Sequence, residues 1–363
     1  MLIHRQLNMF TRRNFLASSA LSFTGLATLR LSQSGYADAK HRNPSLRGTK
    51  QSRLGLSLSG YADSNPHDGK RLDSELHDSK RPDASKPFRI SLNTSTIRTY
   101  QLPVERQIEL CGAAGFDGIE LWVADIQKYL DKGGNLADLA KKLKDNRLIL
   151  ENIIGFAPWA SDDEQKRKAG VQQMQQEMEM TARLGGKYIA APVMGIEKID
   201  RDRLDEYAQR YRQILETGRT AGVTPLLELW GSGALFSLAD AVHIALGTEH
   251  PDANWLLDFY HLYRGGNSFD SLKLLNVARL PLFHINDYPA TPPREQLNDS
   301  DRVYPGDGIC PFQTILPFLF KSGFSGGFSV ELFNDGYCKQ QTPEQMLAVT
   351  LAKTTQLIKK HIL

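Results

Sequence analysis

The 363-residue sequence has few cysteines, no long apolar run and no glycine-rich nucleotide loop. Cys111, Cys310 and Cys338 lie far apart without a C-x-x-C pair, which excludes a disulfide scaffold and a zinc ribbon. Beyond the N-terminal region no stretch approaches the roughly eighteen apolar residues of a membrane helix, so we expect no span in the mature chain. The sequence also lacks a phosphate-cradling motif, which favours an unphosphorylated ligand.

Acidic and basic residues are distributed unevenly. The formal charge of +3 comes from the first 87 residues, because residues 88–363 contain 30 Lys or Arg against 34 Asp or Glu. Composition is otherwise that of a soluble globular protein, with 41% hydrophobic and 23% charged residues. A mildly acidic folded part argues against a nucleic-acid partner.

Residues 1–39 have the pattern of an export signal. Paired arginines open the segment Thr11–Leu16 (TRRNFL), a moderately apolar run follows, and Ala37–Ala39 supplies small residues in an A-x-A arrangement. This order is typical of a twin-arginine signal peptide, which predicts an exported, periplasmic or extracytoplasmic protein.

Residues 40–87 are predicted to be a flexible linker. They contain nine hydrophobic residues in forty-eight, too few to offset the entropy of ordering a packed core. The sequence SGYAD occurs at residues 34–38 and again at residues 59–63, so part of the region is duplicated. A solvated spacer explains this composition better than a functional basic arm.

Residues 88–363 alternate strand-like and helix-like segments. We expect helices near residues 103–114, 136–146, 162–184, 201–221, 237–247, 268–276, 311–322 and 343–360. Eight such pairs in this length predict a single α/β domain, a (β/α)8 TIM barrel. An open doubly wound sheet is the alternative, disfavoured because no G-x-G-x-x-G follows the first strand. The strand candidates are Phe88–Asn93, Gly118–Val123, Leu148–Phe156, Tyr188–Val193, Thr224–Trp230, Trp255–Tyr260, Leu282–Asp287 and Phe328–Phe333.

Four consecutive strands each carry one ionisable residue between apolar neighbours: Glu228, Asp258, His284 and Glu331. Side chains at the carboxyl ends of barrel strands point into one mouth, so we expect these four at the same height. Alone, each carboxylate could cap a helix and the histidine could be a core residue. Three carboxylates crowded in a low-dielectric mouth would repel one another, and a divalent cation resolves this.

The three oxygen donors and one nitrogen donor of this set predict one divalent ion, most simply Mn²⁺, with Co²⁺, Mg²⁺ or Zn²⁺ as alternatives. One or two coordination positions would remain open for substrate oxygens.

Three motifs resemble a known family: Asp258–His261 (DFYH), Asp301–Gly308 (DRVYPGDG) and Phe328–Phe333 (FSVELF). They resemble the sugar isomerase/epimerase superfamily with the xylose isomerase-like barrel, and the C-terminal half is most similar to its bacterial inosose isomerases. The resemblance covers nearly all of residues 88–363 in element order, with its specific motifs in residues 224–340. The export signal and the repeated linker have no counterpart in the cytoplasmic members.

The resemblance implies roles for individual residues. Glu228, Asp258, His284 and Glu331 match metal ligands, Glu228 and Glu331 also match the acid/base carboxylates, and His261 and Arg302 match residues that contact substrate oxygens. The implied enzyme is a metal-dependent isomerase or epimerase of a ketose or inosose, in which a carboxylate moves a proton through an enediolate that the ion stabilises.

Weaker candidates lie at other strand ends. Glu120 and Trp122 in the second strand are predicted to contact substrate, and Glu151 could do the same, although either glutamate could equally be a barrel-layer or capping residue. Trp159 and Trp230 could stack on a sugar ring, although core packing explains them equally well. Asp287 could orient a ligand of the metal.

Other functions are weighed against this hypothesis. A zinc-dependent endonuclease needs more histidines than His261 and His284 at the mouth. A dehydratase uses the same enediolate and stays open, whereas a non-catalytic sugar-binding protein has no need of two acid/base carboxylates. The predicted partner is a small sugar or inosose, and a homo-oligomer is compatible with the sequence.

Overall fold

The protein is described here from a computed structural model that defines residues 88–362. The predicted signal peptide at residues 1–39 and the predicted linker at residues 40–87 lie outside the described residues.

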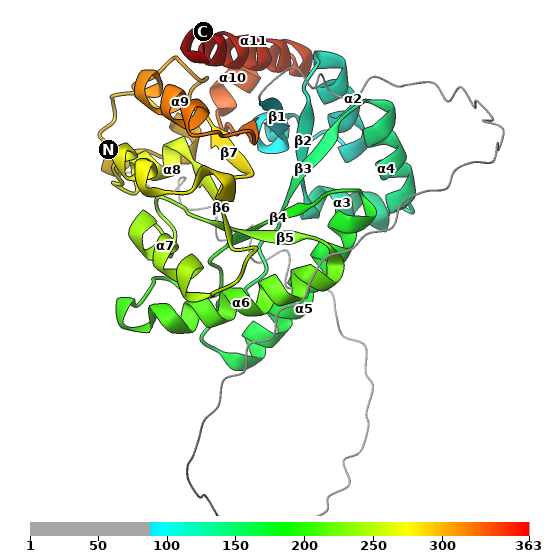
Figure 1. Ribbon diagram of the computed structural model, residues 1–363. Helices are drawn as coiled ribbons and strands as arrows, with labels where there is room; N and C mark the ends of the chain where they lie inside the picture. Colours follow the sequence, from blue (N-terminus) through cyan, green and yellow to red (C-terminus); the bar gives the residue numbers. More distant parts are fainter. Residues whose placement is uncertain (1–87, 363) are drawn as a thin grey trace, which may run out of the picture. The chain divides into compact units, whose positions relative to one another are not determined.

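The described part of the chain is a closed parallel β-barrel with helices on its outside, which confirms the predicted TIM barrel (Figure 1). Each strand pairs in parallel with its sequence neighbours, and β1 pairs with β8 to close the barrel. All eight predicted strands are present, with ends within three residues of those expected. They are β1 (Arg89–Asn93), β2 (Gly118–Trp122), β3 (Ile149–Ile154), β4 (Tyr188–Pro192), β5 (Thr224–Glu228), β6 (Asn254–Asp258), β7 (Leu282–Ile285) and β8 (Gly327–Val330).

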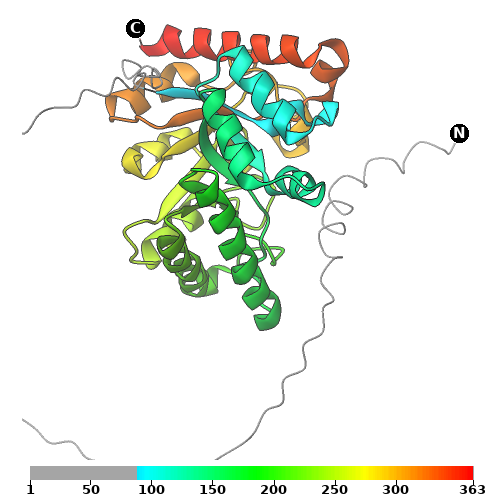
Figure 2. The same cartoon turned by 90° about the vertical axis from the view of Figure 1, so that its right-hand side faces the viewer.

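The helices surround the sheet, and α11 (Pro343–Ile362) packs beside α2 (Val104–Ala114) (Figures 1 and 2). Seven of the eight predicted helices are present. The eighth, expected at residues 268–276, is instead the short 3₁₀ helix Phe269–Leu274, capped by the Ser268 hydroxyl. Three α-helices were not predicted: α3 (Val123–Asp131), α8 (Phe259–Arg264) and α10 (Asp335–Gln340). The α-helices are α2 (Val104–Ala114), α3 (Val123–Asp131), α4 (Leu136–Asp145), α5 (Glu164–Arg183), α6 (Leu204–Ala221), α7 (Leu238–Gly247), α8 (Phe259–Arg264), α9 (Phe312–Lys321), α10 (Asp335–Gln340) and α11 (Pro343–Ile362).

Two hydrophobic cores follow from the alternation of side chains along each strand. The larger core lies between sheet and helices and takes the outward residues such as Leu227, Leu257 and Phe283. A smaller core fills the barrel with Ile154, Ala190, Leu226, Leu256 and Leu282. The inward residue that follows two positions later on β5, β6 and β7 is ionisable, so the barrel interior changes from apolar to charged toward its carboxyl end.

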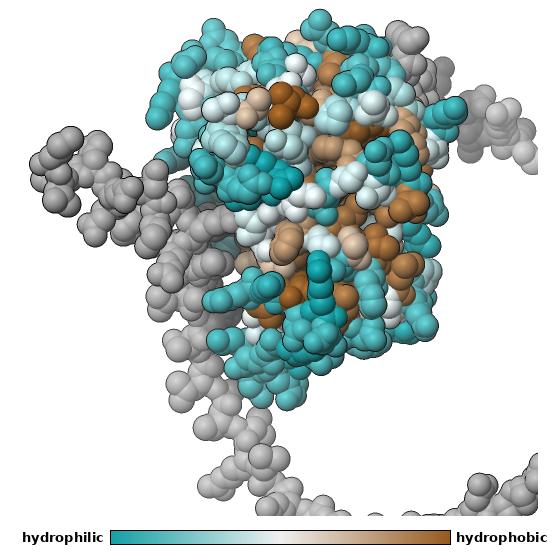
Figure 3. Space-filling view, turned by 90° about the vertical axis from the view of Figure 1, so that its left-hand side faces the viewer, coloured by the Kyte–Doolittle hydropathy of each residue, from teal (hydrophilic) through white to brown (hydrophobic). Residues whose placement is uncertain are grey.

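One face of the molecule shows hydrophobic residues gathered toward one side, with hydrophilic residues around them (Figure 3). Among the described residues, the exposed large apolar side chains include Leu246 and Leu274. The predicted homo-oligomer remains a prediction. Between residues 88 and 362 no helix is both long and apolar enough to cross a membrane.

Candidate metal centre

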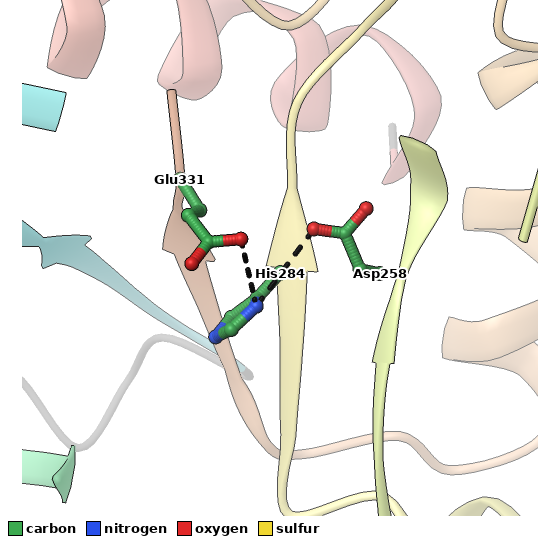
Figure 4. A group of neighbouring side chains, drawn as sticks. All are labelled: Asp258, His284 and Glu331. Carbon is green, nitrogen blue, oxygen red and sulfur yellow. Dashed lines mark ion pairs between the residues drawn. The ribbon is translucent and has the colours of Figure 1, made fainter. Parts of the chain in front are cut away.

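His284 is the centre of a cluster of buried carboxylates at the carboxyl end of the barrel. Its Nδ1 lies 3.3 Å from Glu331 Oε2, 3.8 Å from Asp258 Oδ2 and 3.9 Å from Glu228 Oε1. Figure 4 shows Asp258 and Glu331 on either side of the imidazole, reaching it from β6 and from the end of β8. The structure therefore brings together all four residues of the predicted metal set.

The four residues converge although they do not share one register level. Asp258 pairs with His284, but Glu228 pairs with Leu256, and Ser329 rather than Glu331 pairs with His284. The prediction that all four residues lie at the same height in the barrel is therefore wrong. The register of neighbouring strands is staggered, as barrel closure requires. The longer glutamate side chains of Glu228 and Glu331 bridge the offset.

The hydrogen bonding of these residues fits a divalent cation. Among the described residues His284 Nδ1 and Glu228 Oε2 have no hydrogen-bond partner, although both are buried. Ligand atoms of Asp258, His284 and Glu331 all lie within 4.8 Å of one another, and Glu228 borders this group through His284. Buried polar atoms without partners are costly, and a cation at this point would satisfy them.

The local charges separate the protonation of the two glutamates. Burial raises the pKa of Glu228 to about 8, and the neighbouring carboxylate of Glu331 adds to the rise. Burial also tends to raise the pKa of Glu331. The positive charges of His284 and Arg302 outweigh this effect and hold the Glu331 pKa below its usual range. The two glutamates therefore differ in their preference for the protonated form.

Arg302 is buried beside the carboxylates rather than in a surface ion pair. Its Nη1 donates to Glu331 Oε2 at 2.7 Å and to Asp258 Oδ2 at 3.1 Å. The guanidinium also lies over the rings of Tyr260 and Phe333, at 4.5 and 5.0 Å from their centroids. These contacts fix a positive charge next to the candidate ligands.

The tautomer of His261 follows from its contact with Arg302. His261 Nε2 lies 3.1 Å from Arg302 Nη2, and because a guanidinium only donates, Nε2 must accept. Burial lowers the pKa of His261, which keeps the ring neutral with its proton on Nδ1. Nδ1 has no partner among the described residues, so this N–H is left to bind a ligand atom.

Two asparagines that the sequence analysis did not select hold the carboxylates in place. Asn286 Nδ2 donates to Asp258 Oδ2 at 2.9 Å, and Asn93 Nδ2 donates to Glu331 Oε1 at 3.1 Å. Asn286 lies two residues after His284 and therefore faces inward, and Asn93 is the last residue of β1. Searching strand ends for amides as well as for ionisable groups would have found both.

Glu120 has other partners than the predicted substrate hydroxyls. Its carboxylate is fully buried and contacts His284 Nε2 and the Nδ2 of Asn152 on β3. The structure therefore places Glu120 behind His284. This corrects its predicted role: Glu120 is a partner of the histidine and not of substrate hydroxyls.

Glu151 lies away from the candidate metal centre. Its carboxylate forms a bidentate salt bridge with Arg89 at the start of β1, in which Arg89 Nε lies 2.6 Å from Oε1. It also accepts a hydrogen bond from Ser91 Oγ. This places Glu151 near the amino end of the barrel, where residues serve stability.

Asp287 organises a loop instead of orienting His284. Its side chain accepts hydrogen bonds from the backbone N–H groups of Tyr288, Gly306, Gly308 and Cys310. Asp287 is three residues from His284, so strand alternation turns it away from the barrel interior. It fixes the loop that follows Arg302.

Half-buried aromatic rings form a continuous chain at this end of the barrel. Trp122 packs edge-on against Phe156 and Phe333, Phe156 packs against Trp230, and Trp230 lies beside His261. The Trp122 indole N–H donates to Asn93 Oδ1 at 2.9 Å, so that ring is fixed in position.

Trp159 does not belong to this aromatic chain. It is fully buried, donates to the Pro192 carbonyl oxygen and packs on Tyr211. Of its two expected roles, core packing is correct.

Comparisons of the sequence and of the fold with known proteins agree on one kind of barrel. The sequence profile of the family described as “Xylose isomerase-like TIM barrel” matches residues 108–355. An inosose isomerase of Bacillus velezensis is 26% identical over 265 residues, 72% of this chain and 94% of that protein. An inosose isomerase of Bacillus subtilis is 27% identical over 273 residues, 74% of this chain and 96% of that protein. The crystal structure of an IOLI protein, described with a binding zinc atom, matches with a TM-score of 0.70 at 25% identity and covers 76% of this chain and 99% of its own.

Proposed function

The chain belongs to the xylose isomerase-like TIM barrel family, and on that premise we propose that it is a divalent-metal-dependent isomerase or epimerase of a small, unphosphorylated polyhydroxy ketone. The named relatives, which are inosose isomerases, support a ketose or inosose as the substrate class. From the twin-arginine pattern in residues 1–39 we also propose that it acts outside the cytoplasm.

One observation carries the proposal: three carboxylates from separate strands face the unpartnered Nδ1 of His284 within 3.9 Å. Glu228, Asp258, His284 and Glu331 would hold the ion, and their three oxygens and one nitrogen suit Mn²⁺ or Zn²⁺. When bound, the ion would polarise the substrate carbonyl and stabilise negative charge that develops on oxygen.

The protein side chains supply the proton transfers. Glu228 and Glu331 would remove the proton from the carbon next to the carbonyl and return one to the neighbouring carbon or to the other face. The N–H on His261 Nδ1 would donate to a substrate oxygen, and Arg302 would offset charge that develops there.

The surroundings of the centre support a neutral polyol. The aromatic chain of Trp122, Phe156, Trp230 and Phe333 offers ring faces and edges to the C–H surfaces of a sugar or cyclitol. A neutral ligand would need no positively charged side chain other than Arg302.

Isotope exchange tests the proposal. The purified chain is incubated with Mn²⁺ and a panel of ketoses and inososes in D₂O, and deuterium incorporation is followed by NMR. We expect deuterium to enter one substrate without loss of water, and E331Q to abolish exchange while the matched variant E151Q retains it.

Two alternatives appear as distinct results of the same experiment. Loss of water with deuterium uptake would identify a dehydratase. Ligand binding that survives E331Q without any exchange in the native protein would identify a non-catalytic sugar-binding barrel. Absence of exchange with every substrate and every metal would contradict both enzyme assignments.

A further inference from the structure

We propose that Glu120 is the positioning residue of the candidate metal centre: it holds His284 so that Nδ1, and not Nε2, faces the ion. This inference rests on the proposed function, because it concerns how the chain prepares the histidine to bind the metal.

The two nitrogens of His284 have different surroundings. Nε2 lies 3.1 Å from both carboxylate oxygens of Glu120, whereas Nδ1 faces Glu228, Asp258 and Glu331 without a hydrogen bond. Glu120 and His284 are both fully buried and come from β2 and β7, which are three strands apart around the closed barrel.

The Glu120 carboxylate decides which nitrogen carries the proton. An ionised carboxylate only accepts hydrogen bonds, so Nε2 must donate its N–H to Glu120. An imidazole that binds an ion is neutral, and with the proton on Nε2 its lone pair lies on Nδ1, where the other three carboxylates converge. A carboxylate behind a metal-binding histidine fixes its tautomer and ring orientation and makes the ligand nitrogen more basic.

Glu120 is itself held in place. Asn152 Nδ2 donates to Glu120 Oε2 at 2.8 Å, and β2 and β3 pair Glu120 with Asn152 directly. The carboxylate therefore has one fixed donor from the sheet and a second from the histidine. Such a buried acid is expensive to maintain, and the reactions assigned to Glu228 and Glu331 do not use it.

The neighbouring strand offers a matched control. Glu151 is also a buried carboxylate inside the barrel, but its partners are Arg89 and Ser91, and it does not contact His284. E120Q and E151Q each remove one buried negative charge with little change in volume. Only E120Q takes the negative charge from the acceptor behind the histidine and puts an amide N–H₂ donor in place of one of its two oxygens.

The test is a titration of the full chain with Co²⁺ in the absence of substrate. We expect E120Q to weaken the Kd by about 10- to 100-fold relative to the native protein, the range typical of partners that orient a ligand. E151Q should keep the native Kd within about threefold even if its unfolding temperature falls, because the two effects have different causes.

Proton NMR of the Co²⁺-loaded protein gives a readout that loss of stability would not produce. The native protein should show a paramagnetically shifted, exchangeable N–H resonance from His284 Nε2, protected from solvent by the Glu120 contact. In E120Q this resonance should shift or exchange faster, and in E151Q it should stay unchanged. If E120Q does not fold, E120D shortens the side chain by one methylene and should move both readouts in the same direction.

The outcomes separate this inference from the proposed function. A native chain that binds no divalent ion would overturn both. A native chain that binds Co²⁺, together with an E120Q or E120D variant of unchanged Kd and unchanged N–H resonance, would overturn the role of Glu120 alone.

Discussion

Glu177 on α5 provides a quantitative test of how burial controls ionisation in this barrel. Its side chain is buried, Oε1 accepts from Gln173 Nε2 at 2.8 Å, and Oε2 has no partner among the described residues. Gly155 lies so close to this carboxylate that a methyl group there would collide with it. Burial raises the Glu177 pKa from 4.5 to about 7, and the single hydrogen bond from Gln173 only partly opposes the rise.

The raised pKa sets the sign of the effect on stability. Between pH 4.5 and about pH 7 the folded chain holds a proton on Glu177 that the unfolded chain has lost. The free energy of unfolding therefore falls as pH rises through this window, and above it ionised Glu177 costs about 3 kcal/mol. E177Q removes this cost but keeps the size and shape of the side chain.

We expect E177Q to unfold at higher urea concentration than the native chain at about pH 8, by an amount equivalent to about 2–3 kcal/mol. At about pH 5 the two proteins should differ by less than about 1 kcal/mol, the cost of one unsatisfied amide. The measurement is urea unfolding followed by circular dichroism at both values of pH.

The same helix contains a matched control. Glu179 accepts from Gln175 at the same four-residue spacing, at 3.0 Å, but is exposed to solvent. E179Q should change the free energy of unfolding by less than about 0.5 kcal/mol at either pH. Equal effects of E177Q and E179Q, or an E177Q effect independent of pH, would refute the reasoning.

Three further predictions concern the loop after β7 and Arg302. D287N replaces one acceptor oxygen by a donor that faces backbone N–H groups, and should lower the free energy of unfolding by about 2–4 kcal/mol and speed amide exchange at Gly306 and Gly308, measured by mass spectrometry. G308A should cost about 1–3 kcal/mol in urea unfolding, because the added methyl group would collide with the Tyr288 carbonyl oxygen. R302M should lower turnover by about 100-fold or more without weakening divalent-ion binding, because it removes a positive charge next to the ligands; equal losses in turnover and in ion affinity would contradict this role.

The fold was predictable because its signals are local. Strands such as β5 and β6 alternate between inward and outward residues, and glycines such as Gly222 end helices in the left-handed conformation. The helix α8 was missed because Phe259 and Tyr260 extend the apolar pattern of β6. Its start is marked by Asp258, whose side chain accepts from the His261 backbone N–H. One residue thus serves as both a candidate metal ligand and a helix cap.

The candidate metal set was predictable for the same local reason, since each member stands between outward apolar residues. The contacts that orient the set were not, because they join residues far apart in the chain. Glu120 and His284 are 164 positions apart, and Asn93 and Glu331 are 238 apart. Only closure of the barrel brings these pairs together, and no pattern within a single strand specifies them.

The central claim is that Glu228, Asp258, His284 and Glu331 share one divalent ion. Anomalous diffraction from a crystal of the protein grown with Mn²⁺ tests it directly. We predict one strong anomalous peak between these side chains, about 2.0–2.3 Å from His284 Nδ1 and from the carboxylate oxygens. A peak bound elsewhere, or none at this position in crystals that take up Mn²⁺, would contradict the claim.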